Sequence, residues 1–299
     1  MEILSDPKTA RRYVIERQCT GETVAVVPTM GALHDGHLSL VEIGKEKCDR
    51  VVATIFVNPT QFAPGEDLDK YPRTLKQDLA RLESLGTDAV FVPEVSSMYP
   101  DGCTTSVSPP RVAEGLEGSF RPEHFGGVCT IVLKLFQCLP CNVGVFGQKD
   151  YQQLLVIKAM VRDFNLPIEV LSGEIIRDPD GLAMSSRNRY LSAVEREQAL
   201  CIPKALRSLQ EDVHSGVTSV EELQERLIGR LEDSGEVAHA ARDAAEGQPI
   251  QRGVDSLDYA VVVDSETLEP IEKLNRPAVA LVAARVGQTR LIDNCTISV

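Results

Sequence analysis

The sequence has no tryptophan, only 5% aromatic residues, and fewer basic than acidic residues. Its 31 lysines and arginines stand against 44 aspartates and glutamates, a formal net charge of -13 at pH 7. Nucleic acids and anionic membrane surfaces are bound through broad basic faces, so this balance argues against both as partners. A site for an anionic ligand must instead be built locally, from a few basic residues, backbone N–H groups and a helix N-terminus.

Long apolar runs are also lacking. No stretch approaches the roughly 18 consecutive apolar residues that a transmembrane helix needs. The first residues, Met1 to Pro7, lack the basic region and the apolar core of a secretory signal. The eight cysteines are scattered through a chain of 299 residues, which is long enough to build a core without disulfide or metal staples. We therefore expect reduced thiols and a cytoplasmic protein.

Apolar, β-branched runs alternate with amphipathic segments through the first part of the chain. This alternation favours a parallel α/β sheet, and the absence of a repeat period favours a doubly wound, Rossmann-like one. The expected strands are Thr23–Val27, Val51–Val57, Ala89–Val92, Val143–Phe146 and Ile168–Ile176. Helices are expected over Lys8–Gln18, from a capping box at Thr74 to Gly86, and over Tyr151–Phe164.

The pattern changes after Asn188. Capping boxes at Ser192 and Ser219 predict two long acidic helices. Apolar runs over Leu257–Val263, Val279–Arg285 and Thr289–Ile292 then predict a small antiparallel sheet. The sequence therefore predicts a doubly wound domain over residues 1–188 and a smaller α+β domain over residues 189–299.

The most informative stretch, residues 28–37, reads PTMGALHDGH. A strand, a glycine turn and a helix N-terminus in succession are typical of a phosphate site. His34 and His37 are three residues apart, so on a helical turn they share a face and can address one polyphosphate as neutral or protonated donors. The alternative that one histidine caps or packs while the other is exposed stays open. Zinc is disfavoured because no cysteine or histidine triplet with metal spacing accompanies the pair.

Two further segments have anion-binding character. Residues 146–150, FGQKD, follow a strand at the edge where open α/β sheets bind ligands, and Lys149 there can meet a phosphate as a point charge. Residues 181–188, GLAMSSRN, place hydroxyls beside Arg187 at the expected domain junction, which suits a mobile anion clamp. Each also has a plain interpretation, as an exposed lysine or a polar linker.

Three shorter segments carry weaker functional signals. Residues 56–62, FVNPTQF, put two amides at a strand end, where amides recognise hydroxyls or carboxylates or satisfy loop backbone. Residues 121–125, RPEHF, either supply a carboxylate partner or start a helix. Cys138 and Cys141 form a C-x-x-C motif but precede a strand rather than open a helix, so a redox role is disfavoured and we assign them none.

In their order and spacing these motifs resemble the pantoate–β-alanine ligase family. The resemblance runs from about residue 22 to 192 and includes YPRT at residues 71–74; the remainder matches in length and general pattern. It implies a nucleotidyltransferase of the HIGH and KMSKS type. His34–His37 stands for HIGH, with Asp in the second position, and Met184–Arg187 stands for KMSKS, with Arg in place of the second Lys.

The resemblance implies an ATP-dependent ligase that condenses (R)-pantoate with β-alanine to pantothenate, the precursor of coenzyme A. ATP and pantoate would give pantoyl adenylate and diphosphate, and β-alanine would then attack the acyl carbon and release AMP. The first domain would bind nucleotide and pantoate, and the second would act as a lid. Mg²⁺ would accompany ATP, with protein ligands that we cannot name. A homodimer is also implied, although the sequence does not show which surface pairs.

The resemblance also implies the roles of individual residues. His37 would be the proton donor to the departing diphosphate, with His34 beside it, and Lys149 and Arg187 would neutralise phosphate charge. Gln61 would bind pantoate and later β-alanine, Gln153 would bind pantoate, and Arg121 would act as a gate. The residues that would bind ATP are Met30, Gly31, Ala32, Leu33, His34, Asp35, Gly36, His37, Gly147, Gln148, Lys149, Asp150, Ile176, Met184, Ser185, Ser186 and Arg187.

Other functions remain open at this point. A different adenylyl- or cytidylyltransferase of the same superfamily would share the two histidines but lack Gln61 and Gln153 as substrate readers. A non-catalytic nucleotide sensor acting through the acidic helical domain would bind nucleotide without turnover, and a metallohydrolase would carry stoichiometric zinc. A tRNA synthetase is disfavoured because no tRNA-binding extension is evident.

Overall fold

The computed structural model describes residues 1–63, 68, 70–232 and 253–298. The chain divides into two compact units, Met1–Ile176 and Arg177–Val299. The sequence pattern placed the change near residue 188, whereas residues 177–188 belong with the second unit. The reason is ion pairing within that unit: Arg177 binds Asp293 at 2.7 and 3.0 Å, and Arg196 binds Asp178 at 2.7 Å.

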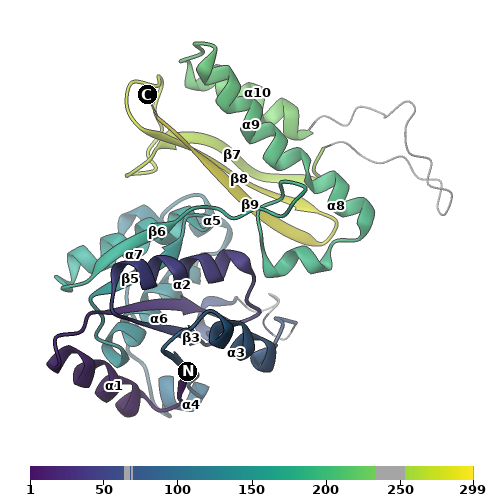
Figure 1. Ribbon diagram of the computed structural model, residues 1–299. Coiled ribbons are helices and arrows are strands. Elements are labelled where there is room, and N and C mark those ends of the chain that lie inside the picture. Colours follow the sequence, from purple (N-terminus) through teal and green to yellow (C-terminus); the bar gives the residue numbers. More distant parts are fainter. Residues whose placement is uncertain (64–67, 69, 233–252, 299) are drawn as a thin grey trace. The chain divides into compact units, whose positions relative to one another are not determined.

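The first unit is built on a parallel sheet (Figure 1). In the part of the unit that the structure describes, six strands pair in the order β1-β4-β3-β2-β5-β6. They are β1 (Glu2–Leu4), β2 (Val24–Thr29), β3 (Arg50–Ile55), β4 (Ala89–Phe91), β5 (Val143–Gly147) and β6 (Glu169–Gly173). All five predicted strands are present. β1 was not predicted because three residues carry no periodicity, and it is defined by its pairing with β4.

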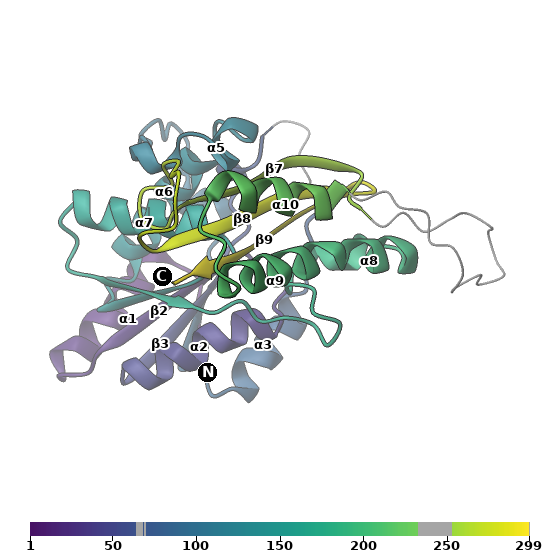
Figure 2. The same ribbon diagram turned by 90° about the horizontal axis from the view of Figure 1, so that it is seen from above.

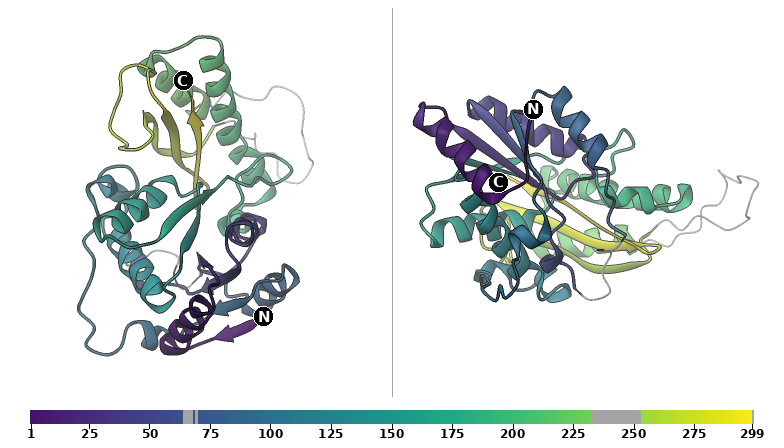
Figure 3. Two further views of the ribbon diagram at one scale, coloured as in Figure 1. Left: turned by 60° about the vertical axis from the view of Figure 1, so that its left-hand side comes forward. Right: turned by 90° about the horizontal axis from the view of Figure 1, so that it is seen from below.

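Helices cover both faces of this sheet (Figure 3). They are α1 (Pro7–Cys19), α2 (Asp35–Lys47), α3 (Leu75–Ser84), α4 (Val95–Met98), α5 (Glu117–Phe120), α6 (His124–Cys138) and α7 (Tyr151–Asp163), with short 3-10 helices η1 (Pro59–Gln61) and η2 (Arg111–Ala113). Alternate residues of β2 enter different cores. Val24 and Val26 pack in the cluster that holds α1, α6 and α7, whereas Ala25 and Val27 pack with α2 and α3. This two-faced covering is the predicted doubly wound arrangement.

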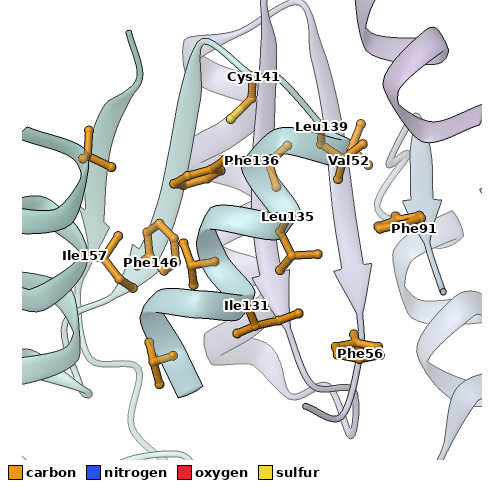
Figure 4. Packing of buried hydrophobic residues seen from close by; sticks show 14 of the residues in the cluster. Val52, Phe56, Phe91, Ile131, Leu135, Phe136, Leu139, Cys141, Phe146 and Ile157 are labelled. Carbon is orange, nitrogen blue, oxygen red and sulfur yellow. The ribbon is translucent and has the colours of Figure 1, made fainter. Parts of the chain in front are cut away.

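Helix α6 forms the centre of the larger core (Figure 4). Its Ile131, Leu135 and Phe136 are all buried, and the Phe136 ring meets Phe146 of β5 edge-on, with centroids 6.2 Å apart. Burying one such side chain contributes about 1.5–3 kcal/mol. Buried residues from Gly127 to Val132 face nearly every side of the helix, so the sequence indicated only its possible start at residues 121–125 and not its extent.

The second unit combines an antiparallel sheet with helices along one face (Figure 2). Its described strands are β7 (Ser256–Asp264), β8 (Ala278–Val286) and β9 (Thr289–Ile297), paired in that order as the sequence predicted. Its helices are η3 (Ser186–Tyr190), α8 (Ala193–Ala199), α9 (Cys201–His214) and α10 (Val220–Glu232). The capping box predicted at Ser192 is confirmed by its reciprocal bonds with Glu195, 2.7 and 3.3 Å long.

Within residues 1–63, 68, 70–232 and 253–298, no helix is both long enough and apolar enough to cross a bilayer.

Candidate active site

Residues 30–34 link β2 to α2 and form what we call the glycine loop. Gly31 has φ +82° and Ala32 has φ +51°, so the backbone turns through the left-handed region at both positions. A Cβ at Gly31 would lie 3.1 Å from Asp78 Oδ2 and from Ile55 Cγ2, so glycine is needed for space as well as conformation. The Gly31 N–H donates to Thr29 Oγ1 at 3.2 Å. The predicted strand–turn–helix arrangement is therefore present.

Asp78 of α3, a residue that the sequence did not single out, holds this loop. Its carboxylate is 2% exposed and accepts the N–H of Ala32 at 3.0 Å and of Leu33 at 2.9 Å. These N–H groups are consequently not phosphate ligands; the helix leaves the N–H groups of Asp35 and Gly36 for that role. The signal in the sequence was a charged residue on the apolar stripe of a helix.

The capping box predicted at Thr74 is wrong. Thr74 precedes α3, but its side chain makes no capping bond. Its hydroxyl instead donates to the carboxylate of Asp78, at 3.2 Å to Oδ1 and 3.1 Å to Oδ2. The hydroxyl is therefore bonded to a side chain one turn along the same helix and not to a backbone N–H of the first turn.

His34 and His37 lie together at the start of α2, with ring centroids 4.0 Å apart. The backbone N–H of His34 donates to Nδ1 of His37 at 3.3 Å, so the proton of neutral His37 is on Nε2. Burial, the neighbouring His34 and the positive charges of Lys149 and Arg81 lower the pKa of His37 to about 3. At neutral pH His37 is thus an uncharged ring whose Nε2–H can donate.

Two features keep this histidine pair in place. A Cβ at Gly36 would lie 3.0 Å from the His34 ring, so glycine lets that ring lie against the helix. Arg81 of α3 donates to the carbonyl of Leu33 at 2.7 Å and forms an ion pair with Asp35. The Asp35 carboxylate is consequently paired with Arg81.

The turn from β5 to α7 carries Gly147, Gln148, Lys149 and Asp150, as predicted. It is fixed to β6 because the Gln148 N–H donates to the carbonyl of Gly173 at 2.8 Å. Lys149 is close enough for its charge to lower the pKa of His37, which places the turn beside the glycine loop. Ile176 adjoins it as well: its Cβ lies 3.8 Å from a Cβ built on Gly36.

Gln61 lies in η1 with its side chain buried. Its Nε2 donates to Met30 Sδ at 3.0 Å, so the predicted substrate reader touches the glycine loop. Its Oε1 accepts from Asn58 Nδ2 at 3.1 Å. Asn58 is itself oriented by hydroxyl donors, Tyr99 at 2.8 Å and Thr60 at 3.0 Å. Tyr99 was missed by the sequence analysis because it is far from Asn58 along the chain.

Helix α6 packs against η1 and supports Gln61. A Cβ at Gly127 would lie 2.2 Å from the carbonyl oxygen of Thr60, so only glycine permits this approach. His124 donates from Nδ1 to the Gln61 carbonyl at 2.9 Å, and its Nε2 faces Arg121 Nη1 at 3.2 Å. Burial and Arg121 lower the pKa of His124 to about 4. The RPEHF segment therefore starts a helix, and Arg121 Nη2 donates to the Gln61 carbonyl at 3.3 Å.

The side chains of two adjacent glutamines of α7 differ in their hydrogen bonding. Gln152 is buried and its amide is committed to the protein: it accepts from the Glu117 N–H at 3.0 Å and donates to the Val112 carbonyl at 3.0 Å. Gln153 is half-buried, and within residues 1–63, 68, 70–232 and 253–298 its side chain forms no hydrogen bond. Its amide is thus open to a ligand, as its predicted role requires.

Residues Met184–Arg187 belong to the second unit. Ser185 Oγ accepts the N–H of Arg187 at 3.2 Å and caps η3. Asn188 is buried and donates to the carbonyl of Ala183 at 3.0 Å. Hydrogen bonds at Ser185 and Asn188 therefore anchor the segment within the second unit.

Cys138 ends α6 and Cys141 precedes β5. Burial raises the pKa of both thiols, that of Cys141 to about 12. Neither is a reactive thiolate at neutral pH, which agrees with the expected lack of a redox role. Among the described residues, no three or more His, Cys, Asp or Glu side chains are grouped so as to hold a metal ion.

The parallel sheet, the histidine pair at a helix N-terminus and the buried amide beside it together define a doubly wound α/β enzyme that acts on a small polar substrate and a polyphosphate. The chain matches the profile of the Pantoate-beta-alanine ligase family over residues 2–296. It is 50% identical to the pantothenate synthetase of Rhodopirellula baltica over 297 residues, 98% of each chain. It is 48% identical to that of Acidobacterium capsulatum, over 95% of this chain and 90% of the relative.

Solved structures agree. Pantothenate synthetase from Thermus thermophilus superposes with a TM-score of 0.87 at 39% identity over 99% of both chains. The pantoate-beta-alanine ligase from Francisella tularensis, complexed with beta-gamma ATP and beta-alanine, gives 0.74 at 34% identity over 99% and 97%. The chain therefore belongs to the pantoate-beta-alanine ligase family. The fold and the ligase activity expected from its motifs are confirmed.

Proposed function

We propose that this ligase joins pantoate to β-alanine in two half-reactions at the glycine loop, with ATP activating the acid first. One observation carries the proposal: Gln61 Nε2, the predicted reader of the acid, lies 3.0 Å from Met30, the first residue of the loop predicted to hold ATP. A carboxylate bound by Gln61 would thus lie beside the nucleotide phosphates. Such positioning supplies much of the rate of a displacement reaction.

In the first half-reaction a pantoate carboxylate oxygen forms a bond to the α-phosphorus of ATP, and the bond from that phosphorus to the bridging oxygen breaks. Diphosphate leaves with the electron pair. His37 donates a hydrogen bond from Nε2 to the departing oxygen, because its ring is neutral and its Nδ1 is occupied by the His34 N–H. Lys149 and Arg187 neutralise phosphate charge, and Gln153 holds pantoate together with Gln61.

In the second half-reaction the neutral amine of β-alanine attacks the acyl carbon of pantoyl adenylate. A C–N bond forms, the bond from the acyl carbon to the AMP oxygen breaks, AMP leaves with the electron pair, and the nitrogen releases one proton to solvent. The structure of the Francisella tularensis ligase is described as complexed with beta-gamma ATP and beta-alanine, which supports binding of a nucleotide and this amine by the family. Gln61 then binds β-alanine, and Arg121 gates entry.

Mg²⁺ belongs to this proposal as a companion of ATP. Among the described residues no group of three or more His, Cys, Asp or Glu side chains is placed to hold a metal ion, so Mg²⁺ would be bound mainly through the ATP phosphates and water. The second unit is proposed as a lid through Met184–Arg187. A homodimer is proposed too, and sedimentation equilibrium tests it. The eight free cysteines support the cytoplasm as the place of action.

The test withholds β-alanine. Enzyme, ATP, Mg²⁺ and (R)-pantoate are mixed, diphosphate is measured, and β-alanine is then added with products identified by mass. We expect a stoichiometric burst of diphosphate, followed by AMP and pantothenate. Nucleotide binding without a burst or product would withdraw the adenylation route and favour a nucleotide sensor. A burst with another small acid but not with pantoate would point to a different member of the superfamily.

A further inference from the structure

A carboxylate buried beneath a loop that binds a polyanion is unexpected, because its charge repels the ligand. Asp78 is such a group: it is 2% exposed and uses both oxygens on the glycine loop, one for Ala32 and one for Leu33. Thr74 adds a third donor from its hydroxyl. Buried charge of this sign in a polyanion site requires a compensating role in the geometry of the loop.

The role follows from peptide geometry. The chain contains no cis peptide bond over its described ranges, so each C=O points opposite to the N–H of the next residue. With the N–H groups of Ala32 and Leu33 turned toward Asp78, the carbonyl oxygens of Gly31 and Ala32 are turned away from α3. The loop therefore presents acceptors on its other side, which suit a hydroxyl or an amine of a ligand and not a phosphate oxygen.

Hydrogen bonds also connect the glycine loop to His37. Leu33 is fastened to α3 at both ends of the residue, since its N–H donates to Asp78 and its C=O accepts from Arg81 at 2.7 Å. The next residue, His34, uses its N–H to fix Nδ1 of His37 at 3.3 Å. A displacement of Leu33 would therefore move the His34 N–H, and through it change the tautomer and the orientation of the His37 ring.

We propose that Asp78 is a positioning residue of the ligase reaction: its carboxylate turns the glycine loop so that the Gly31 and Ala32 carbonyls face the ligand and His37 presents Nε2–H to the leaving group. This inference rests on the proposed function. It assigns no contact between Asp78 and substrate; Asp78 acts through the loop.

The test compares two buried carboxylates that each accept two backbone N–H groups and a threonine hydroxyl. Asp264, at the end of β7, is also buried and accepts the N–H groups of Glu266 and Thr267, both at 2.9 Å, and the Thr267 hydroxyl at 3.1 Å. Asp78→Asn turns an amide NH₂ toward one of the two loop N–H groups, while Asp264→Asn removes the charge from a turn with no proposed site residue, where Oδ1 accepts both N–H groups and Oδ2 pairs with Arg276 at 3.0 Å. Thr74→Val and Thr267→Val form a second, milder matched pair.

We expect Asp78→Asn to lower kcat/KM for ATP by about 10²-fold, the usual effect of misplacing a reacting group by an ångström, with Thr74→Val smaller in the same direction. Asp264→Asn and Thr267→Val should lower Tm but leave kcat/KM unchanged. Long-range ¹H–¹⁵N spectra should show His37 with an unprotonated Nδ1 in the native enzyme and a mixture of tautomers in Asp78→Asn.

The outcomes separate the two proposals. A native enzyme that makes no pantothenate contradicts the proposed function, whatever the variants do. An active native enzyme whose kcat/KM for ATP and His37 spectrum are the same in Thr74→Val and Thr267→Val overturns the positioning role. If Asp78→Asn does not fold, the Thr74→Val pair decides the question alone.

Discussion

The Nδ1 atom of His37 accepts the backbone N–H of His34, the residue that caps the same helix, at 3.3 Å. This bond assigns the single proton of the neutral ring to Nε2, and the low pKa of about 3 keeps the ring neutral. A neutral ring with this fixed tautomer presents Nε2–H to a polyphosphate throughout the pH range above its pKa. The arrangement explains why two histidines lie so close together without mutual repulsion.

Replacing His37 by alanine should lower kcat by roughly 10²–10³, the usual effect of removing one donor that stabilises developing charge. The measurement is the initial diphosphate burst with pantoate and ATP. The Tm of the variant should stay near that of the native enzyme. Unchanged turnover in a folded His37→Ala protein would remove this residue from the mechanism.

Stability should depend on pH through two histidines. His37 and His124 have pKa values of about 3 and about 4, below the ordinary 6.5. The unfolded chain binds their protons below pH 6.5 and the folded chain does not, so the free energy of unfolding falls as the pH drops from 6.5. We expect Tm to decrease between pH 7 and 5.5, and less steeply in His37→Gln and His124→Gln. Parallel Tm curves for all three proteins would contradict this assignment.

Gln61→Ala should raise the KM for pantoate more than the KM for ATP, because the amide is predicted to contact the acid. Gln152→Ala is the matched control: its amide is equally buried but is committed to the Val112 carbonyl and the Glu117 N–H. The control should lower Tm and leave both KM values unchanged. Equal effects of Gln61→Ala on the two substrates would mean that it serves the other ligand.

Two neighbouring glycines of α6 should differ sharply. A Cβ at Gly127 would lie 2.2 Å from the Thr60 carbonyl oxygen, whereas one at Gly126 would meet nothing nearer than the Val107 carbonyl oxygen at 3.8 Å. We expect Gly127→Ala to displace η1, to destabilise the fold by about 1–3 kcal/mol and to impair use of pantoate. Urea unfolding and pantoate kinetics measure both effects. A Gly126→Ala protein with the same losses would exclude the steric explanation.

Thiol chemistry offers a simple check of the C-x-x-C motif. Cys19 and Cys103 are exposed, whereas Cys141 is buried with its pKa raised to about 12. Iodoacetamide at pH 8 should therefore alkylate the two exposed thiols and spare Cys141, as peptide mass mapping will show. Cys138→Ser with Cys141→Ser should retain ligase activity in reducing and oxidising buffers alike.

Local patterns predicted most strands, several helices and the motifs of the site, because these depend on residues close together in the chain. Asp78 and Tyr99 escaped prediction for the opposite reason: each acts on a residue far away in sequence, Ala32 in one case and Asn58 in the other. The capping preference of Thr74 was not realised, because its hydroxyl donates to Asp78 one turn along the same helix. For α6 the sequence indicated only a possible start at residues 121–125, because a run of buried residues from Gly127 to Val132 faces every side of the helix and leaves no period to detect.

The strand order has a consequence for folding during synthesis on the ribosome. β2 lies between β3 and β5, and its register with β5 pairs Ala25 with Val143. A ribosome must therefore synthesise about half of the protein before β2 gains its second neighbour. Until then one edge of a largely apolar strand stays unpaired, and unpaired apolar edges promote aggregation of nascent chains. We expect truncated chains ending before Val143 to depend on chaperones for solubility, and the complete first unit to fold slowly for its size.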